Sequence, residues 1–482
     1  MSHHDVLIIG ARCTGSMLAT SLRRSGLNVA MVERSDVATD RKPAQAVQSD
    51  VFRWLDGMGL MERSRQAFGP FMDDLDLRLG DFRARGRYAD PKEPWGGSAF
   101  VHRKDLDPML LEYAEESGAV LIDDFKAEST ITRNGRVVGI QGTRRGRSLR
   151  LFARLVVGAD GRTSSLATMV GSRRYNESCT DRGYCWGYFD RSGDDAGSQF
   201  IVHRWKDNFY WGGAAPNGQI FVGTSFARSR LDDIRQDRSA AYIDLVKSCD
   251  GTAHIAHSYG LAKPPKVAMR FHGFFREPTG PGWVLVGDSG HFKDPVAGRG
   301  IGDAIHQVRT VTPFIIRGLG SGSERSLDQG LERWGRQRDR DLVGHYWNTI
   351  DLSDPDPLSP VLPAVLRQWP SEEAVRLVGQ VLIHELTPRQ LVTPPRVLRA
   401  TAAMLAQNPR NSPDTLRELG RITKIDLIRR LRERRPSHQR VLNEDVASVS
   451  ERLPAPTSVT LTNMSHSDNG QRAELIDSAA RG

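Results

Sequence analysis

The chain has 482 residues, of which 39% are hydrophobic and 26% are charged. This length and composition predict a soluble globular protein with two or three domains. No run of about 18 apolar residues occurs, so a transmembrane segment is not expected. The net charge is +9, but residues 421–440 alone hold eight Lys/Arg and two Asp/Glu. The remainder carries little net charge, which argues against a nucleic-acid-binding surface.

The cysteines and the N-terminus bear on the cellular setting. Four cysteines are scattered along the chain, and their spacing predicts neither a disulfide framework nor a metal site. The N-terminal segment MSHHDVLIIG has no basic region before its apolar run, so no secretory signal is predicted. We therefore expect a cytoplasmic protein, in which thiols stay reduced.

The N-terminal third predicts alternating strands and helices. Residues 5–10 predict an apolar strand, residues 14–25 a helix, and residues 28–33 a second strand. This order is typical of a doubly wound α/β fold with a parallel sheet. The following elements are two helices, a strand, two hairpin strands around Arg145-Gly146 and a further strand: 51–61, 104–116, 120–123, 131–140, 149–152 and 154–159.

The pattern changes in the middle of the chain. Residues 182–226 alternate and are rich in aromatic side chains, which predicts an antiparallel sheet and a second domain. Residues 283–287 predict another buried parallel strand, and residues 301–319 a helix. After Trp347 the chain is rich in prolines and then helical to about residue 435. The polar residues 437–482 predict a disordered tail.

The segment 10–15, of sequence GARCTG, lies between the first predicted strand and the first predicted helix. A dinucleotide-binding turn needs glycines where the chain turns tightly and where helix and strand touch, and Gly10 and Gly15 meet these needs. The helix N-terminus then offers free N–H groups to phosphates. Arg12 stands where the second glycine is usual, and it either points away from the phosphates or contacts one. Glu33, at the end of the second strand, can bind ribose hydroxyls.

Two later motifs follow predicted strands in the same way. The first is Asp160-Gly161, in the sequence VGADGRTS, and the second is Gly287-Asp288, in the sequence VLVGDSG. An Asp at the carboxyl end of a strand is placed to bind a ribityl or ribose hydroxyl. The second motif continues into Pro295 and a glycine-rich stretch that opens a helix, whose N-terminus favours negative charge on a reduced flavin.

These three motifs resemble those of the group A flavoprotein monooxygenases, a superfamily similar to p-hydroxybenzoate hydroxylase that includes flavin halogenases and geranylgeranyl reductase-type enzymes. The resemblance covers about residues 5–340 and implies bound FAD. It implies a discontinuous FAD-binding domain (1–75, 96–180 and 270–345), interrupted by an antiparallel-sheet substrate domain (76–95 and 181–269). A helical C-terminal region (346–436) follows.

The motifs and the resemblance together predict the site residues. Gln45 or Gln48 is expected near the flavin. Catalytic roles are predicted for His291, Pro295 and Arg103. Cofactor contacts are predicted at Gly10, Arg12, Cys13, Thr14, Gly15, Glu33, Arg34, Arg103, Asp160, Gly161, Gly287, Asp288, Pro295, Gly300 and Ile301.

The resemblance implies a reaction in which NADH or NADPH reduces FAD and the reduced flavin uses O2 to oxygenate a small or medium aromatic or polycyclic substrate. His203, Tyr210 and Trp211 are candidate substrate contacts, with core packing as the alternative. Two other functions stay open: a flavin reductase or dehydrogenase that inserts no oxygen, and a flavin-binding protein without turnover. Neither a metal nor a nucleic acid is expected.

The basic segment 421–435 places Ile422, Ile425, Ile428 and Leu431 three residues apart. Such a helix either binds a membrane surface or a partner protein, or packs on the body with a solvated basic face. We favour packing.

Overall fold

The computed structural model describes residues 3–38, 45–90, 92, 94–191, 199–269, 271–354, 356 and 358–433. They belong to one compact unit. The tail at 437–482, the end of the basic segment at 434–435, and Pro355 and Pro357 lie outside the described residues.

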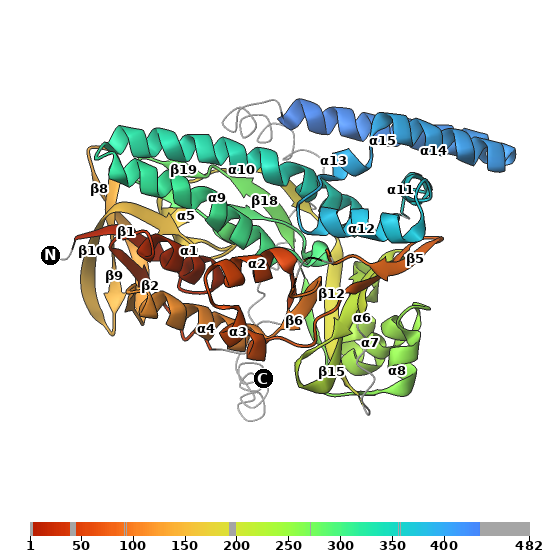
Figure 1. The fold of residues 1–482 in the computed structure, drawn as a ribbon, viewed down its shortest axis with the longest axis horizontal. Helices are drawn as coiled ribbons and strands as arrows, with labels where there is room; N and C mark the ends of the chain where they lie inside the picture. The colour runs from red at the N-terminus through yellow and green to blue at the C-terminus, as the bar shows by residue number, and fades with distance from the viewer. Residues whose placement is uncertain are drawn as a thin grey trace, which may run out of the picture. The chain divides into compact units, whose positions relative to one another are not determined.

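A mainly parallel sheet begins with the N-terminal strand and takes up strands from as late as residue 285 (Figure 1). Its strand order is β19-β20-β10-β1-β2-β7, and β1 lies in the centre, parallel to both β10 and β2. The order and direction of the strands confirm the predicted doubly wound α/β class. The strands are β1 (His3–Ile9), β2 (Val29–Val32), β7 (Val120–Ile122), β10 (Arg147–Gly158), β19 (Thr279–Gly280) and β20 (Trp283–Leu285).

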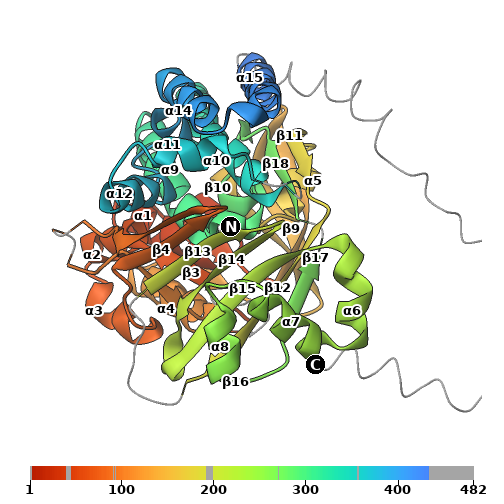
Figure 2. The same ribbon diagram turned by 90° about the vertical axis from the view of Figure 1, so that its right-hand side faces the viewer.

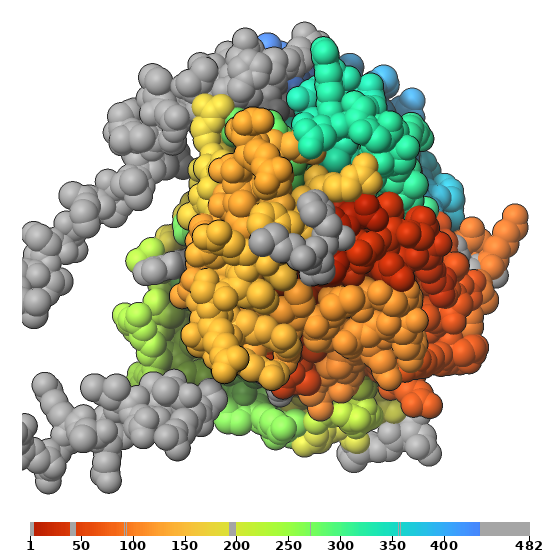
Figure 3. Space-filling model, turned by 90° about the vertical axis from the view of Figure 1, so that its left-hand side faces the viewer, coloured from red at the N-terminus to blue at the C-terminus, as the bar shows by residue number. Residues whose placement is uncertain are grey.

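The two faces of this sheet are covered differently. Successive side chains of a strand point to opposite faces. Val6 and Ile8 of β1 pack against the helices, whereas Leu7 and Ile9 pack against a β-hairpin and a short helix. Figure 3 shows that hairpin side of the molecule, in orange and yellow. The helices are α1 (Cys13–Arg23), α2 (Ser49–Gly57), α4 (Arg103–Glu116), α9 (Gly300–Gly320) and α10 (Glu324–Ser353), and the opposite layer is β8 (Phe125–Arg133), β9 (Arg136–Arg144) and α5 (Ser165–Met169).

The hairpin region differs from its prediction in two places. The segment 131–140 is not one strand, because Asn134 and Gly135 take positive φ angles of 49° and 75° and turn the chain between β8 and β9. The segments 149–152 and 154–159 are not two strands but parts of β10. The first half of β10 is mostly exposed and the second half is buried. The residue types therefore change along β10, although the strand itself is continuous.

A second large sheet has the order β16-β12-β15-β14-β13-β4-β5, with β17 on β12. All its pairs are antiparallel except β13 with β4. Because β4 and β5 come from before residue 90, the sheet joins two distant segments of the chain. The bounds of a separate substrate domain stay a prediction. The strands are β4 (Asp74–Leu79), β5 (Phe82–Arg87), β12 (Arg182–Asp190), β13 (Gln199–Trp205), β14 (Asn208–Ala214), β15 (Gln219–Ala227), β16 (Gly260–Leu261) and β17 (Lys266–Met269).

This second sheet is also covered on both faces. Helices α6 (Leu231–Gln236), α7 (Arg238–Lys247) and α8 (Ala253–Ser258) pack on one face around Val222 and Tyr242 (Figure 2). The other face packs against the C-terminal helices through an apolar cluster. There are also smaller pairings: β3 (Gln45–Gln48) with β6 (Ser98–Val101), and β18 (His272–Arg276) between β11 (Arg174–Cys179) and β21 (His291–Phe292). The short helix α3 (Met61–Ser64) follows α2.

The C-terminal region is helical, as predicted. Its last described helix, α15, lies beside α14 (Figure 1). Ile422 of α15 packs on the body, but Leu416, Leu427 and Leu431 are each more than half exposed. In the described part of the chain, no helix combines the length and apolarity needed to cross a bilayer. The helices are α11 (Val361–Leu366), α12 (Ser371–Leu382), α13 (Pro388–Leu391), α14 (Pro394–Gln407) and α15 (Ser412–Glu433).

Candidate flavin site and substrate cavity

The three motifs meet at the carboxyl ends of β1, β10 and β20. A Cβ atom on Gly10 would lie 2.6 Å from the carbonyl oxygen of Ala159, the residue before Asp160. A Cβ atom on Gly287 would lie 2.6 Å from Oγ1 of Thr14. Segments separated by more than 120 residues are thus in backbone contact where a ligand of an open α/β sheet binds.

The loop after β1 has the geometry that a phosphate-binding turn needs. Gly10 has a φ of +100°, and a Cβ atom on Gly15 would lie 1.8 Å from the Gly10 carbonyl oxygen. Only glycine therefore allows α1 to start so close to β1. Among the described residues, no side-chain cap is found at the N-terminus of α1, and such a helix N-terminus suits an anion. Arg12 turns aside, and its guanidinium donates to the Asp36 carbonyl oxygen at 3.2 Å.

Glu33 holds this loop from the end of β2. One carboxylate oxygen accepts the Ala11 N–H at 3.0 Å. The other accepts the N–H groups of Arg34 at 3.0 Å and Ser35 at 3.1 Å. The predicted ribose-binding carboxylate therefore also fixes the backbone that surrounds it.

A buried carboxylate that the sequence analysis missed connects α1 with α4. Asp107 is fully buried, and it accepts two hydrogen bonds of 2.8 Å from Arg103 and one of 2.8 Å from the Cys13 thiol. Burial opposes the charged form of Arg103, but Cys13 and Asp107 outweigh it and raise its pKa. Asp288 also contributes to this shift, so Arg103 and the third motif are electrostatically close. The signal was the spacing of four between Arg103 and Asp107 on one helix face.

Asp160 has a structural role and an unused oxygen. Its Oδ2 accepts the N–H and the hydroxyl of Ser165, both at 2.6 Å, and so caps α5. Its Oδ1 is buried and has no hydrogen-bond partner among the described residues. Gly161 follows with a φ of +80°. A buried carboxylate oxygen without a donor is a place where a ligand hydroxyl fits.

The loop between the third motif and α9 is fixed by buried polar contacts. The Gly287 N–H donates to Gln307 at 3.0 Å. Asp294 accepts from Tyr184, from Thr180 at 3.0 Å and from the Val296 N–H at 3.0 Å. Burial raises the pKa of Asp294 to about 6. These bonds hold the short helical turn from Pro295 to Ala297 at one place.

Buried ion pairs flank the start of α9. Arg299 makes a two-pronged contact with Asp50, at 3.0 and 2.6 Å, and also donates to Gln48 at 2.8 Å. Lys293 lies 2.8 Å from Asp303. Within the described part of the chain, no side chain caps α9 either, so its N-terminus, with Gly300 and Ile301, is a second helix end that suits an anion. Gln45 lies 3.5 Å from Arg103, so Gln45 and Gln48 serve different arginines.

His291 lies in an aromatic cluster below α10. Its ring centre is 4.4 Å from that of Phe275 and 5.9 Å from that of Tyr346. Neither ring nitrogen has a hydrogen-bond partner within the described residues. Burial, together with the cations Lys293 and Arg338, lowers the pKa of His291 well below its ordinary value. This environment favours the neutral imidazole, and a catalytic role for His291 stays a prediction.

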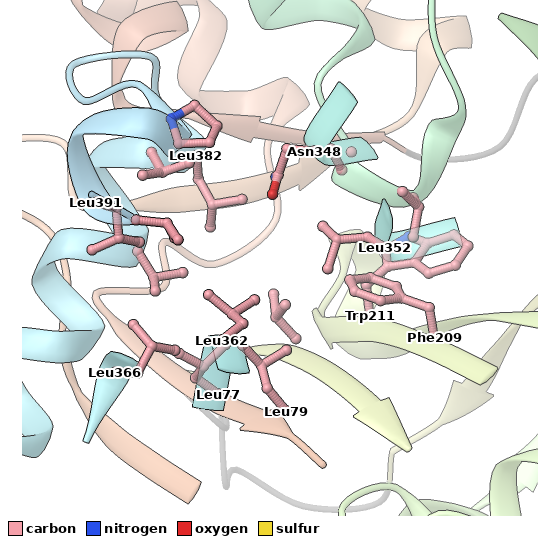
Figure 4. Close-up of a pocket in the computed structure, with 18 of the residues that line it drawn as sticks. Leu77, Leu79, Phe209, Trp211, Asn348, Leu352, Leu362, Leu366, Leu382 and Leu391 are labelled. Atoms are coloured by element: carbon pink, nitrogen blue, oxygen red, sulfur yellow. The ribbon is translucent and has the colours of Figure 1, made fainter. Parts of the chain in front are cut away.

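An apolar cavity adjoins the loop before α9 (Figure 4). The centres of water-sized spheres can occupy about 80 Å³ of this cavity. By the same measure, this is several times the space that one water molecule needs. Residues 296–298 form one boundary. The wall formed by the second sheet contains Leu77, Leu79, Phe200, Val202, Phe209 and Trp211, and the opposite wall comes from α10, α11, α12 and α13, including Asn348, Leu352, Leu362, Leu366, Val378 and Leu391.

The structure separates the three candidate substrate residues. Trp211 lines the cavity, and its ring lies over Gly223, where a Cβ atom would be 2.3 Å from it. His203 and Tyr210 lie on the opposite face of the sheet. His203 contacts Asp76 at 3.2 Å, and the Tyr210 hydroxyl donates to the Leu245 carbonyl oxygen at 3.1 Å. Tyr210 and Trp211 are neighbours in β14, so they point to opposite faces.

These residues fit FAD. The N-termini of α1 and α9 suit an anionic pyrophosphate. Gly10 and Gly15 let the protein backbone approach such a group closely, because they carry no side chain. The carboxylates of Glu33 and Asp160 suit the hydroxyl groups of the cofactor. A doubly wound sheet of this kind, combined with an antiparallel sheet and an apolar cavity, defines the class of FAD-dependent oxidoreductases.

Comparison with known proteins gives the family. Residues 3–333 match the family model described as FAD binding domain, so the chain belongs to this family. It is 26% identical over 346 residues to a digeranylgeranylglycerophospholipid reductase of Methanocella arvoryzae, covering 67% of this chain and 79% of that protein. These relationships confirm the resemblance to the group A flavoprotein monooxygenase superfamily.

Solved structures agree on the fold. A flavoprotein/dehydrogenase from Cytophaga hutchinsonii superimposes with a TM-score of 0.69 at 17% identity, covering 85% of this chain and all of that chain. PqsL of Pseudomonas aeruginosa, described as a probable FAD-dependent monooxygenase, gives a TM-score of 0.61 at 18% identity, covering 73% and 98%.

Proposed function

We propose that the protein is an FAD-dependent monooxygenase, a hydroxylase or epoxidase that uses NADH or NADPH and O2. The observation that carries this proposal is the cavity beside residues 296–298, in which none of the described lining side chains is charged or titratable. Adding or removing hydrogen at a substrate carbon requires a group that donates or accepts a proton. Oxygen insertion places fewer such demands on the protein, whose task is to bind, orient and exclude water.

When bound, FAD would accept electrons from NAD(P)H and activate O2. The chain's own residues would hold it: the first turns of α1 and α9 at its anionic groups, and Glu33 and Asp160 at its hydroxyls. Arg103, buried beside Asp107, would bring a fixed positive charge to the same edge of the sheet. The contacts of Arg12 with Asp36 argue against a protein that cannot bind the flavin.

Rapid-mixing absorbance spectroscopy on the FAD-loaded protein tests the proposal. We expect NADH or NADPH to bleach the flavin without oxygen, and O2 to restore its colour with one O2 consumed per NAD(P)H. With a coupled substrate, the product mass should increase by one oxygen atom. Loss or gain of hydrogen without O2 uptake would refute the proposal.

A reductase without oxygen insertion is the second candidate. The similarity to a protein named digeranylgeranylglycerophospholipid reductase favours it. The same experiment separates the two functions, since only a monooxygenase consumes O2 in proportion to product.

We also propose a binding role for the exposed face of α15. The packing that we favoured accounts for Ile422, but not for Leu416, Leu427 and Leu431. Apolar side chains on a basic helix suit an anionic lipid surface. Sedimentation with phosphatidylglycerol vesicles, compared with phosphatidylcholine vesicles, tests this: no sedimentation of the full chain with either would remove the membrane role.

A further inference from the structure

The cavity beside residues 296–298 is unusual in its lack of charge. Its lining contains leucine, valine, phenylalanine, alanine, glycine, proline, one tryptophan and one asparagine. Burying an ionised group in such surroundings is costly unless a partner of opposite charge is present. Among the residues that the structure describes, no Lys, Arg, His, Asp or Glu lines this cavity to act as that partner.

The charged groups nearest in sequence to the cavity boundary are already paired. Lys293 binds Asp303, and Arg299 binds Asp50 through two hydrogen bonds. Asp294 is used by Tyr184, Thr180 and the Val296 N–H. Arg204, two residues after Val202 in β13, is also buried, but its guanidinium donates to the backbone carbonyl oxygens of Lys206, Asp354 and Asp356 and not to a carboxylate. A substrate carboxylate would therefore have to displace existing buried contacts to reach a cation.

One polar side chain does face the cavity. Asn348 projects from α10 among leucines, and Figure 4 shows its amide directed into the space between the two walls. Its side chain makes no hydrogen bond to any other residue that the structure describes. A neutral amide can donate to a carbonyl or accept from a hydroxyl.

We infer that the substrate is an electrically neutral, hydrocarbon-rich molecule whose single hydrogen-bonding group, a hydroxyl or carbonyl, contacts Asn348. This inference rests on the proposed function only in taking the cavity as the substrate site. It excludes ionised aromatic and aliphatic acids, which the overall resemblance to p-hydroxybenzoate hydroxylase would have allowed. Specificity lies in the wall from α10 to α13, since these helices supply Asn348 and most of the leucines.

Calorimetric titration of the FAD-loaded protein at pH 8 with matched probes tests the inference. The pairs are 1-decanol with decanoate and 2-naphthol with 2-naphthoate, which differ in charge but keep a chain or a ring. We expect saturable binding of at least one neutral probe and at least about 100-fold weaker binding of its acid. Equal binding of the acid, or no binding of either neutral probe, would overturn the inference.

Two variants locate the binding. Asn348→Leu should weaken the bound neutral probe by about five-fold, because one hydrogen bond is lost, and leave the acid unchanged. Leu352→Lys should weaken the neutral probe and let the acid bind. If Leu352→Lys does not retain FAD, Asn348→Leu decides alone: unchanged affinity for the neutral probe would exclude this cavity as its site. Binding is measured without O2 or NAD(P)H, so failure of the proposed oxygenation does not affect the result.

Discussion

The flavin edge of the parallel sheet and the cavity wall of the second sheet are built on opposite principles. At the flavin edge, backbone segments approach within van der Waals contact and buried charges are paired, as in Arg103 with Asp107. In the cavity, side chains from β4, β13, β14 and four helices enclose space without a charge. Rigid polar contacts suit a cofactor held at one place, whereas apolar walls suit the substrate that we propose for the cavity. The two regions should therefore respond differently to substitution.

The largest expected effect comes from the glycines at the flavin edge. A Cβ atom on Gly15 would lie 1.8 Å from the Gly10 carbonyl oxygen, so Gly15→Val must push α1 away from β1. We expect colourless protein with an FAD affinity reduced at least about 100-fold. Titration with FAD measures it. Gly57→Ala, where a Cβ atom meets nothing within 4 Å, is the matched control and should stay yellow.

The buried charges make the next prediction. Asp107→Asn leaves Arg103 buried without its anion, which should cost about 3–5 kcal/mol of unfolding free energy. Urea denaturation of the variant measures this loss. Asp105→Asn, on the exposed side of the same helix, should cost far less. A loss for Asp107→Asn no greater than for Asp105→Asn would mean that the flavin edge does not depend on this pair.

Asp294 lies between the two regions, and its raised pKa predicts that the stability of the protein depends on pH. Burial raises its pKa from an ordinary value of 3.8 to about 6. The folded protein thus keeps a proton that the unfolded chain releases, so this group lowers stability as pH rises from about 4 to about 6. The full loss is about 3 kcal/mol. Asp294→Asn cannot titrate.

The test is the unfolding free energy of both proteins at pH 4.5 and pH 7. The unfolding free energy of Asp294→Asn, relative to that of the wild type, should be higher at pH 7 than at pH 4.5. A constant difference between the two proteins at both pH values would contradict a raised pKa.

The contrast between the regions also explains what the sequence could predict. Gly10, Asp160 and Gly287 each follow an apolar strand. Because a strand followed by such a turn is visible within a few residues of the sequence, the α/β class and the FAD cofactor could be predicted. The cavity was not readable. Leu77, Trp211 and Leu391 come from segments more than 100 residues apart and have no local signature, because only tertiary packing brings them together. Half of the environment of Asp107 was visible, because Arg103 lies four residues before it in α4, but its second partner, Cys13, lies on α1 and is brought close only by tertiary packing.

A smaller effect is expected at Gly223, in the cavity wall. A Cβ atom there would lie 2.3 Å from the Trp211 ring. Gly223→Ala should therefore displace the ring at a cost of about 1–3 kcal/mol and change its fluorescence. Thermal unfolding and emission spectra measure both. Gly260→Ala, which meets nothing within 4 Å, should change neither.

The smallest effect is expected on the far face of the same sheet. The Tyr210 hydroxyl donates to the Leu245 carbonyl oxygen at 3.1 Å and lies 3.0 Å from the Ser248 hydroxyl, both on the side of α7. Tyr210→Phe removes these contacts and should cost about 1 kcal/mol of stability. Because Tyr210 and Trp211 point to opposite faces of β14, binding of 1-decanol and 2-naphthol should not change. A marked loss of probe affinity in Tyr210→Phe would show that the face packed against α7, and not only the face lined by Trp211, takes part in substrate binding.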